Sequence, residues 1–376
     1  MQSYGFESIN YWHDEDSKYD IFNGNNEKKN FFDACSKGDV ELVNEYISKS
    51  KDVLFLVNQK DSFMKTPLHI ASSHGHLDIV KILVENDANV NVLNYKKMTP
   101  LHFSSMFGYI ELTKVLINMK VSINQQDQTG ASALAYACGK GHTEIAKLLI
   151  DNGADIYTKM RFLEFDGNFD ILEPIYFACK NGHLEIVKYL INKGNCPVNL
   201  YGPNMKVTPL HVACKFGQFE IVEELINKGA LVNEISFNKF TPLHEACAYT
   251  KFRATEDNLL KIVKLLIKNG AKIDEVTNHF TFTALDFACD NSYDDIIRYL
   301  HSIGAKCDMN NELVRHIINW LNVRPLILAR PYDDHKINKK HKLSPLGGII
   351  TATITNDRNS VDDLYMQLKM RIAKFL

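Results

Sequence analysis

The sequence predicts an all-α solenoid of stacked helix-turn-helix units with loop or hairpin tips, followed by a small C-terminal extension of α/β-like character. The string TPLH occurs at Thr66, Thr99, Thr208 and Thr241, and two of the steps between these positions are 33 residues long. A glycine-led segment with an apolar stripe, first seen at Gly75, recurs after it. Internal repeats of this period are typical of solenoids, whose units bury their apolar faces against one another.

Weaker copies of the string fill the rest of the array. Ser132 lies 33 residues after Thr99, Glu173 follows 41 residues later, and Thr283 lies 42 residues after Thr241. A degenerate copy begins near Lys29. We therefore expect about eight repeats over residues 29–308. Insertions near residues 159–167 and 251–258 either add partner contacts or are tolerated surface drift.

Each unit contains the start and stop signals of two helices. Thr66 can cap a helix whose first position, Pro67, needs no backbone N–H. Gly75 supplies the left-handed backbone that ends this helix. Ile79 and Leu83 belong to the apolar stripe of a second helix. One such pair cannot bury its apolar face alone, so the units are expected to stack.

The period, the TPLH string and the glycine turn together resemble the ankyrin repeat, and the resemblance covers about three quarters of the chain. It implies a non-catalytic protein–protein interaction module, a scaffold or adaptor that binds its partner in the concave groove of the array. It also implies that the histidines of the string, such as His69, and those after the turn glycine, such as His76, make structural hydrogen bonds.

In this family, partners are gripped by the loop tips and by the outer face of the first helix. Carried over residue by residue, the resemblance gives this groove: Phe63, Lys65, His74, Tyr95, Lys96, Met98, Met106, Phe107, Lys140, Lys180, Asn181, Lys215, Phe216, Phe237, Phe240 and Tyr249. Exposed aromatic and Met side chains mark recognition surfaces. We expect a protein or peptide partner with acidic and aromatic or aliphatic residues. The alternative is that some of these side chains pack on neighbouring repeats.

Six of the eight cysteines follow an alanine at one repeat position, and we expect buried packing thiols there: Cys35, Cys138, Cys179, Cys214, Cys247 and Cys289. Equivalent atoms of adjacent repeats should lie ~8–10 Å apart, too far for a disulfide or for shared zinc ligation. Buried thiols fit a reducing compartment, the cytoplasm or the nucleus. Delivery into another cell stays open.

Composition and motifs favour no other function class. The 376 residues are 45% hydrophobic and 23% charged, and the formal net charge of −2 gives no whole-protein argument for nucleic acid or a membrane surface. No apolar run is long enough to span a bilayer. Phosphate-binding loops, dinucleotide fingerprints and catalytic motifs are missing. We therefore expect no catalytic or metal-binding residues, no cofactor, no small-molecule substrate and a monomer.

The ends of the chain lie outside the repeat register. Residues 1–28 mix acidic and aromatic side chains and form a tail, a cap over the first repeat or a plug that folds back onto the groove. Residues 309–376 read as a cap and an extension ending in an amphipathic helix, with an apolar stripe that includes Leu364 and Leu368. Two alternatives stay open: a catalytic or ligase-recruiting C-terminal tail, and nucleic-acid binding through the Lys-rich tips.

Overall fold

The computed structural model describes residues 26–163, 169–202, 206–248, 254–278 and 281–306. They all belong to the first of two compact units, Met1–Leu321, and the second unit, Asn322–Leu376, lies outside the described residues. The predicted helical fold is confirmed. Among the described residues no helix has the length and apolar character needed to cross a membrane.

Two kinds of helix alternate along the chain. The first helices of the pairs are α2 (Asn26–Lys37), α5 (Pro67–His74), α7 (Pro100–Phe107), α9 (Ala133–Lys140), α11 (Pro174–Asn181), α13 (Pro209–Lys215), α15 (Pro242–Cys247) and α17 (Ala284–Asn291). The second helices are α3 (Val40–Lys49), α6 (Leu77–Glu85), α8 (Ile110–Asn118), α10 (Thr143–Asp151), α12 (Leu184–Asn192), α14 (Phe219–Asn227), α16 (Glu256–Lys268) and α18 (Asp294–Ser302).

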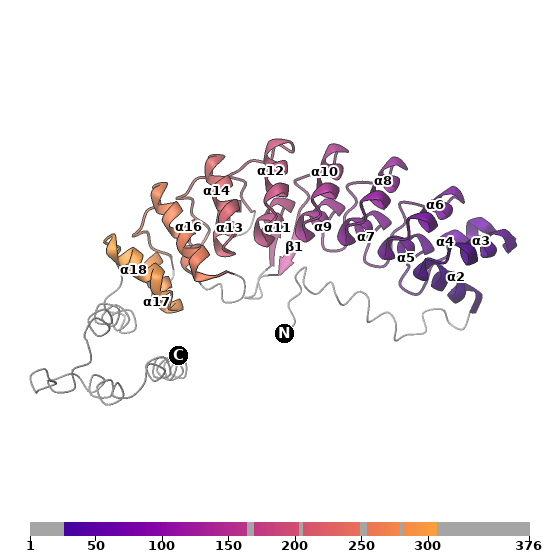
Figure 1. Ribbon diagram of the computed structural model, residues 1–376, viewed down its shortest axis with the longest axis horizontal. Coiled ribbons are helices and arrows are strands. Elements are labelled where there is room, and N and C mark those ends of the chain that lie inside the picture. The colour runs from indigo at the N-terminus through magenta and orange to yellow at the C-terminus, as the bar shows by residue number, and fades with distance from the viewer. Residues whose placement is uncertain (1–25, 164–168, 203–205, 249–253, 279–280, 307–376) are drawn as a thin grey trace, which may run out of the picture. The chain divides into compact units, whose positions relative to one another are not determined.

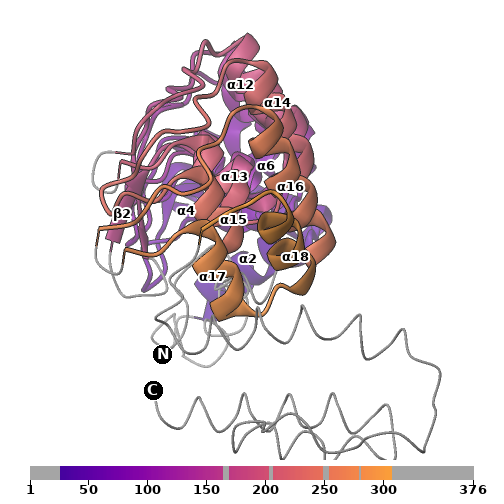
Figure 2. The ribbon, with the colours of Figure 1, turned by 90° about the vertical axis from the view of Figure 1, so that its left-hand side faces the viewer.

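The pairs stand side by side in chain order (Figure 1). Each first helix packs on the first helices of its neighbours, and each second helix packs on the second helices of its neighbours. Figure 2 shows the loops with β2 on one side, the first helices beside them and the second helices on the other side. The core lies between the two layers of helices, where buried aliphatic side chains of the second helices, such as Val43 on α3, Leu83 on α6 and Leu190 on α12, are fully shielded from solvent.

The TPLH string forms the start of the first helices as its residue types predict. Pro67 takes the first helical position of α5, and the backbone N–H of Thr66 donates to Nδ1 of His69 at 3.1 Å. Nε2 of His69 then donates to the carbonyl of Met98 in the next loop at 3.0 Å. His102, His211 and His244 make the same bond to the following repeat, so the structural role predicted for the string histidines is confirmed.

Asparagines in the loops after the second helices form a second connection between repeats. Oδ1 of Asn233 accepts the N–H of Lys272 at 2.8 Å, and its amide nitrogen donates to the carbonyl of Gly270 at 2.8 Å. Asn124 and Asn199 bond in the same way to the next loop, and so does Asn58, which ends a short helix after α3. The repeat signals in the sequence had not predicted a role for these side chains.

A hairpin of two strands and one short helix depart from the plain helix-pair pattern. Part of the insertion near residues 159–167 is a hairpin of β1 (Met160–Leu163) and β2 (Phe169–Leu172), antiparallel with Met160 opposite Leu172. The helix α4 (Val53–Asn58) follows α3, where the sequence shows only a short apolar run. Its N-terminus is capped by Asp52, whose carboxylate accepts the N–H of Phe55 at 2.9 Å.

Candidate functional site

The loop tips before the first helices are held in place by short polar side chains. The carboxylate of Asp61 accepts the backbone N–H groups of Phe63 at 2.9 Å and Lys65 at 2.7 Å. Asn94 does the same in the next loop, accepting from Lys96 at 3.0 Å and Met98 at 2.9 Å. Such bonds fix the turn, so the side chains at the tip start from a rigid backbone.

Backbone hydrogen bonds join consecutive tips. The N–H of Tyr95 donates to the carbonyl of Phe63 at 3.0 Å, and that of Gln128 donates to the carbonyl of Lys96 at 2.9 Å. The same bond recurs near the other end of the array, where Asn278 N–H donates to the carbonyl of Asn238 at 3.2 Å. These bonds fix the register, so that Tyr95 and Gln128 occupy equivalent positions on consecutive tips.

Aromatic rings and lysines gather at the first two of these tips. The rings of Phe63 and Tyr95 lie with their centroids 5.6 Å apart, and Tyr95 is 40% exposed. The ammonium nitrogen of Lys65 lies 5.8 Å from the Phe63 ring, and that of Lys96 lies 5.2 Å from the Tyr95 ring. A cation over an aromatic face is attracted by the ring quadrupole. These predicted residues therefore form one contiguous group.

Two predicted aromatic residues on a later tip differ in exposure. Phe237 is 70% exposed, the largest value among the exposed apolar side chains of the described residues. Phe240, in contrast, packs on Phe287 with ring centroids 5.1 Å apart and on His244 at 5.9 Å. Phe240 therefore supports the neighbouring repeat, as the self-packing alternative anticipated.

Among the predicted residues at the ends of the first helices, His74 is exposed, Met106 is buried and the other described ones are half-buried. The ammonium nitrogen of Lys180 lies 5.3 Å from the Phe216 ring, which joins two repeats. Burial lowers the pKa of Lys140. The amide nitrogen of Asn181 donates to the carbonyl of Gly139 at 2.7 Å, so Asn181 has a structural bond. The other half-buried residues at these helix ends are Phe107, which packs against the core, and Lys215.

Two of the predicted groove residues are buried, and a third lies outside the described residues. Met98 is fully buried and Met106 is 2% exposed, so a partner cannot reach either side chain, and their assignment to the groove was wrong. A long flexible thioether fills core gaps when one is within reach, and at both positions it turns inward. Tyr249 lies outside the described residues.

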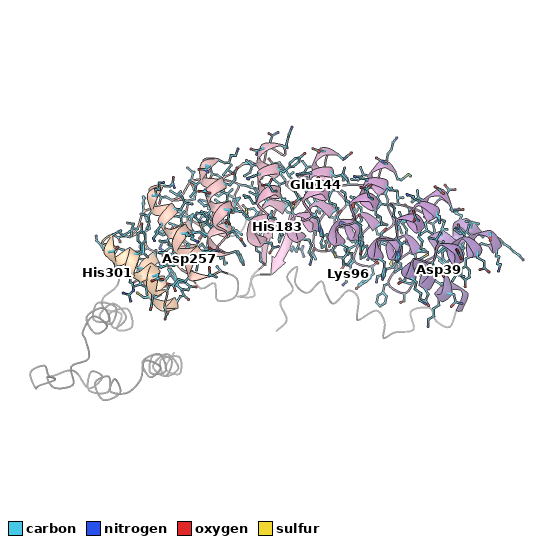
Figure 3. All side chains as sticks on the ribbon, viewed as in Figure 1. Asp39, Lys96, Glu144, His183, Asp257 and His301 are labelled. Carbon is cyan, nitrogen blue, oxygen red and sulfur yellow. The ribbon has the colours of Figure 1, made fainter. Side chains whose placement is uncertain are left out.

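The opposite side of the array has a different surface. Exposed acid–lysine pairs one helical turn apart recur on the second helices: Glu111 with Lys114 at 2.6 Å, Glu144 with Lys147 at 2.9 Å and Glu185 with Lys188 at 3.1 Å. Figure 3 places Glu144 on the second-helix layer and Lys96 at the edge of the loops. The second helices thus carry paired charges, which is typical of a solvated helix face.

The histidines and cysteines do not converge on a pocket in the described part of the chain. Nε2 of His76 donates to the carbonyl of Ser36 at 2.8 Å, and Nε2 of His142 to that of Met106 at 3.0 Å, so the bonds predicted for the turn histidines are confirmed. The thiols of the six register cysteines are buried, also as predicted. Burial raises the pKa of Cys35 to about 12, which keeps this thiol protonated at neutral pH.

One exposed tip residue, Met64, was not predicted from the sequence. Met64 is 46% exposed and has a left-handed backbone with φ 58°, like Lys97 with φ 61° and Lys239 with φ 58°. Met64 stands at the same position of the repeat as these two lysines, and this alignment could have indicated that it is exposed at a tip. It was missed because the family's variable positions, which were carried over, lie on either side of it.

Comparison with known proteins identifies the repeat. A family model described as "Ankyrin repeats (3 copies)" matches residues 31–127, 89–160, 161–236, 199–254 and 231–312. The human "Ankyrin repeat domain-containing protein 7" is 40% identical over 52 residues, 14% of this chain and 19% of that protein. The human "Protein phosphatase 1 regulatory subunit 27" is 45% identical over 53 residues, 14% of this chain and 34% of that protein. The matches thus span about a fifth and a third of these relatives.

Among solved structures, the human ASB11 ankyrin repeat domain superposes with a TM-score of 0.53 at 27% sequence identity. The similarity covers 63% of this chain and 97% of that domain.

Proposed function

Because the chain belongs to the ankyrin repeat family, whose repeats are protein–protein interaction modules, we propose that it is a non-catalytic scaffold or adaptor. In this proposal a partner protein or peptide binds along the loop tips and the neighbouring ends of the first helices. The protein acts as a monomer in a reducing compartment. Residues 1–28, 29–308 and 309–376 form its N-terminal segment, its array and its C-terminal extension. A catalytic or ligase-recruiting C-terminal tail would concern residues outside the described ranges.

The observation that carries the proposal is the exposed aromatic side chain at one position of two tips. On the tip after Tyr95 the same position is occupied by Gln128, and on the tip after Phe237 it is occupied by Asn278. The backbone hydrogen bonds that the tips share establish this equivalence. The fold therefore accepts polar residues there and does not need an aromatic one. An exposed aromatic ring that the fold does not require is favourable when a partner covers it.

The charges beside these rings indicate the kind of partner. Lys65 and Lys96 lie over the rings, and the exposed Lys97 and Lys239 stand at the turns. A segment with aromatic or aliphatic residues among acids would cover the rings and pair with the ammonium groups.

The test is an affinity pull-down with a tip variant, Tyr95→Ala with Phe237→Ala. Its matched control is Leu54→Ala with Phe55→Ala, which removes exposed apolar side chains from α4, 59% and 68% exposed. Proteins bound by the wild type and the control but lost by the tip variant are expected, and purified partners should show a weaker Kd by at least tenfold, about 1.4 kcal/mol. An unchanged set of bound proteins would rule out the tips as the binding surface.

A further inference from the structure

The outward side of the first two tips carries a surplus of positive charge. We call this area the tip surface, and it consists of Lys60, Phe63, Met64, Lys65, Tyr95, Lys96 and Lys97. The carboxylate of these loops, Asp61, is 7% exposed and accepts two backbone N–H groups of its own turn. The corresponding residue of the next loop is the neutral Asn94. Lys60 and Lys97 are exposed and Lys65 and Lys96 are half-buried, whereas Asp61 is buried.

Residues 1–25 have the complementary composition. They contain five acidic residues and one lysine, a formal net charge of −4, together with six aromatic residues. Since the whole chain carries −2, residues 26–376 together carry +2. The sign of the charge therefore changes between this segment and the rest of the chain, and both the segment and the tip surface are rich in aromatic rings.

The segment is attached beside the tip surface. The helix α2 begins at Asn26 and packs on α5, the helix that follows the first of the two tips. The ammonium group of Lys28 donates to the carbonyl of Lys60, which lies on the tip surface itself. A chain of 25 residues can extend up to ~80 Å, and repeats stand ~10 Å apart, so the segment can reach the tips of several repeats.

We propose that residues 1–25 occupy the tip surface, so that the chain covers its own partner-binding surface and a partner must displace this segment. The inference rests on the proposed function. Short flexible tethers give effective concentrations on the order of millimolar, so a contact with a Kd near this value would already fill the surface about half of the time. Charge attraction sets the location, and stacking of aromatic rings on Phe63 and Tyr95 supplies the short-range contact.

Trp12 reports directly on this contact. The chain has two tryptophans, and a Trp320→Phe variant of the full chain leaves Trp12 as the only one. Its quenching by acrylamide is compared with that of a synthetic peptide of residues 1–25. We expect several-fold weaker quenching in the full chain at low salt, and quenching close to that of the peptide at high salt, because exposed charges are screened there.

Two charge-reversed variants of this full chain locate the contact. Lys65→Glu with Lys96→Glu and Lys97→Glu should raise the quenching of Trp12 to the level of the peptide. The matched control, Lys206→Glu with Lys239→Glu and Lys272→Glu, makes the same change of charge on later loops and should leave the quenching low. Circular dichroism verifies that each variant keeps its helices.

The other outcomes overturn the inference. Equal quenching in the full chain and in the peptide means that the segment is not bound. Equal release by both triple variants means unspecific attraction, and release by Leu54→Ala with Phe55→Ala alone places the segment on α4. The quenching of Trp12 is measured without a partner protein. A pull-down that captures no partner would therefore refute the proposed function, while weak quenching of Trp12 would still support the contact of residues 1–25 with the tip surface. Conversely, the tip variant could lose its partners while acrylamide quenches Trp12 of the full chain as strongly as in the peptide. That pair of results would refute this inference and leave the proposed function in place.

Discussion

At the scale of single residues, the turn glycines differ in what lies beside them. Gly141 ends α9 with φ 80°, and a Cβ added to it would lie 2.4 Å from Cε1 of His183 in the next repeat. Gly153 has φ 84°, but nothing lies within 4 Å of an added Cβ. Both glycines need a left-handed backbone, and only Gly141 also needs the space.

This pair separates backbone strain from packing. Gly153→Ala should lower the free energy of unfolding by about 1 kcal/mol, the cost of a left-handed conformation for an L-residue. Gly141→Ala should lower it by about 1–3 kcal/mol more, because the His183 ring must move from its hydrogen-bonded position. Urea denaturation of the two variants measures the difference. Equal losses would show that the ring moves aside freely.

The buried string histidines make the stability dependent on pH. Burial lowers the pKa of His69 and of His211 from 6.5 to about 4. Between pH 6.5 and about 4 the unfolded chain binds more protons than the folded chain. The contribution of these histidines to the free energy of unfolding is therefore fully present above pH 6.5 and is lost as the pH falls towards 4. Each histidine can account for up to about 3 kcal/mol of this loss.

Denaturation midpoints measured between pH 7.5 and about 4.5 test this dependence. His211→Gln should lower the slope of stability against pH, because one proton-binding group is removed from the unfolded chain. The control is Asn233→Ala, which removes two hydrogen bonds but no titratable side chain, so it should leave the slope as in the wild type. A slope that is identical in all three chains would contradict the assignment to the string histidines.

The burial of single side chains was the part of the surface that the sequence could not predict. Lys65 and Met98 occupy the same repeat position, before the threonine of the string, yet Lys65 is half-buried and Met98 fully buried. A charged group must stay near water, whereas a thioether can turn either way. The outcome depends on the space left by neighbouring repeats, which the position in the unit does not specify.

At the scale of elements, the asparagine connections have a measurable contribution. Asn233→Ala removes both bonds to the next loop, and Asn233→Asp keeps the acceptor for the Lys272 N–H but loses the donor to the Gly270 carbonyl. We expect losses of about 1–2 kcal/mol for the alanine variant and about half of this for the aspartate variant. Thermal or urea denaturation measures both. Equal losses would mean that the acceptor bond contributes nothing.

The paired helices were predictable because local signals mark their boundaries, whereas the short helix α4 and the strands β1 and β2 were not. Thr66, Pro67 and Gly75 mark the boundaries of α5 within the sequence itself. The strands β1 and β2 form only because the insertion lets the two segments meet as a hairpin, and short apolar runs are ambiguous between helix and strand. Val53–Val57 was such a run, and capping by Asp52 makes it helical.

At the scale of the whole described array, the repeat period predicts how contacts are distributed. Similar units stack, so each contacts only its neighbours, and stability becomes a sum of unit and interface contributions. The location of the candidate site follows less directly. The family resemblance indicated the tips and helix ends, but the grouping of Phe63, Tyr95, Lys65 and Lys96 depends on distances that only the structure gives.

Nearest-neighbour stability predicts that equal substitutions act differently along the array. Leu190 on α12 and Leu300 on α18 are both fully buried at the same repeat position, and alanine at either should cost about 2–5 kcal/mol locally. Because α12 packs on both α10 and α14, Leu190→Ala should speed hydrogen exchange on both sides of it. Leu300→Ala should speed exchange in α16–α18 and leave α5–α10 unchanged. If Leu300→Ala instead raised exchange evenly across all described helices, the array would unfold as a single cooperative unit, and the additive description would fail.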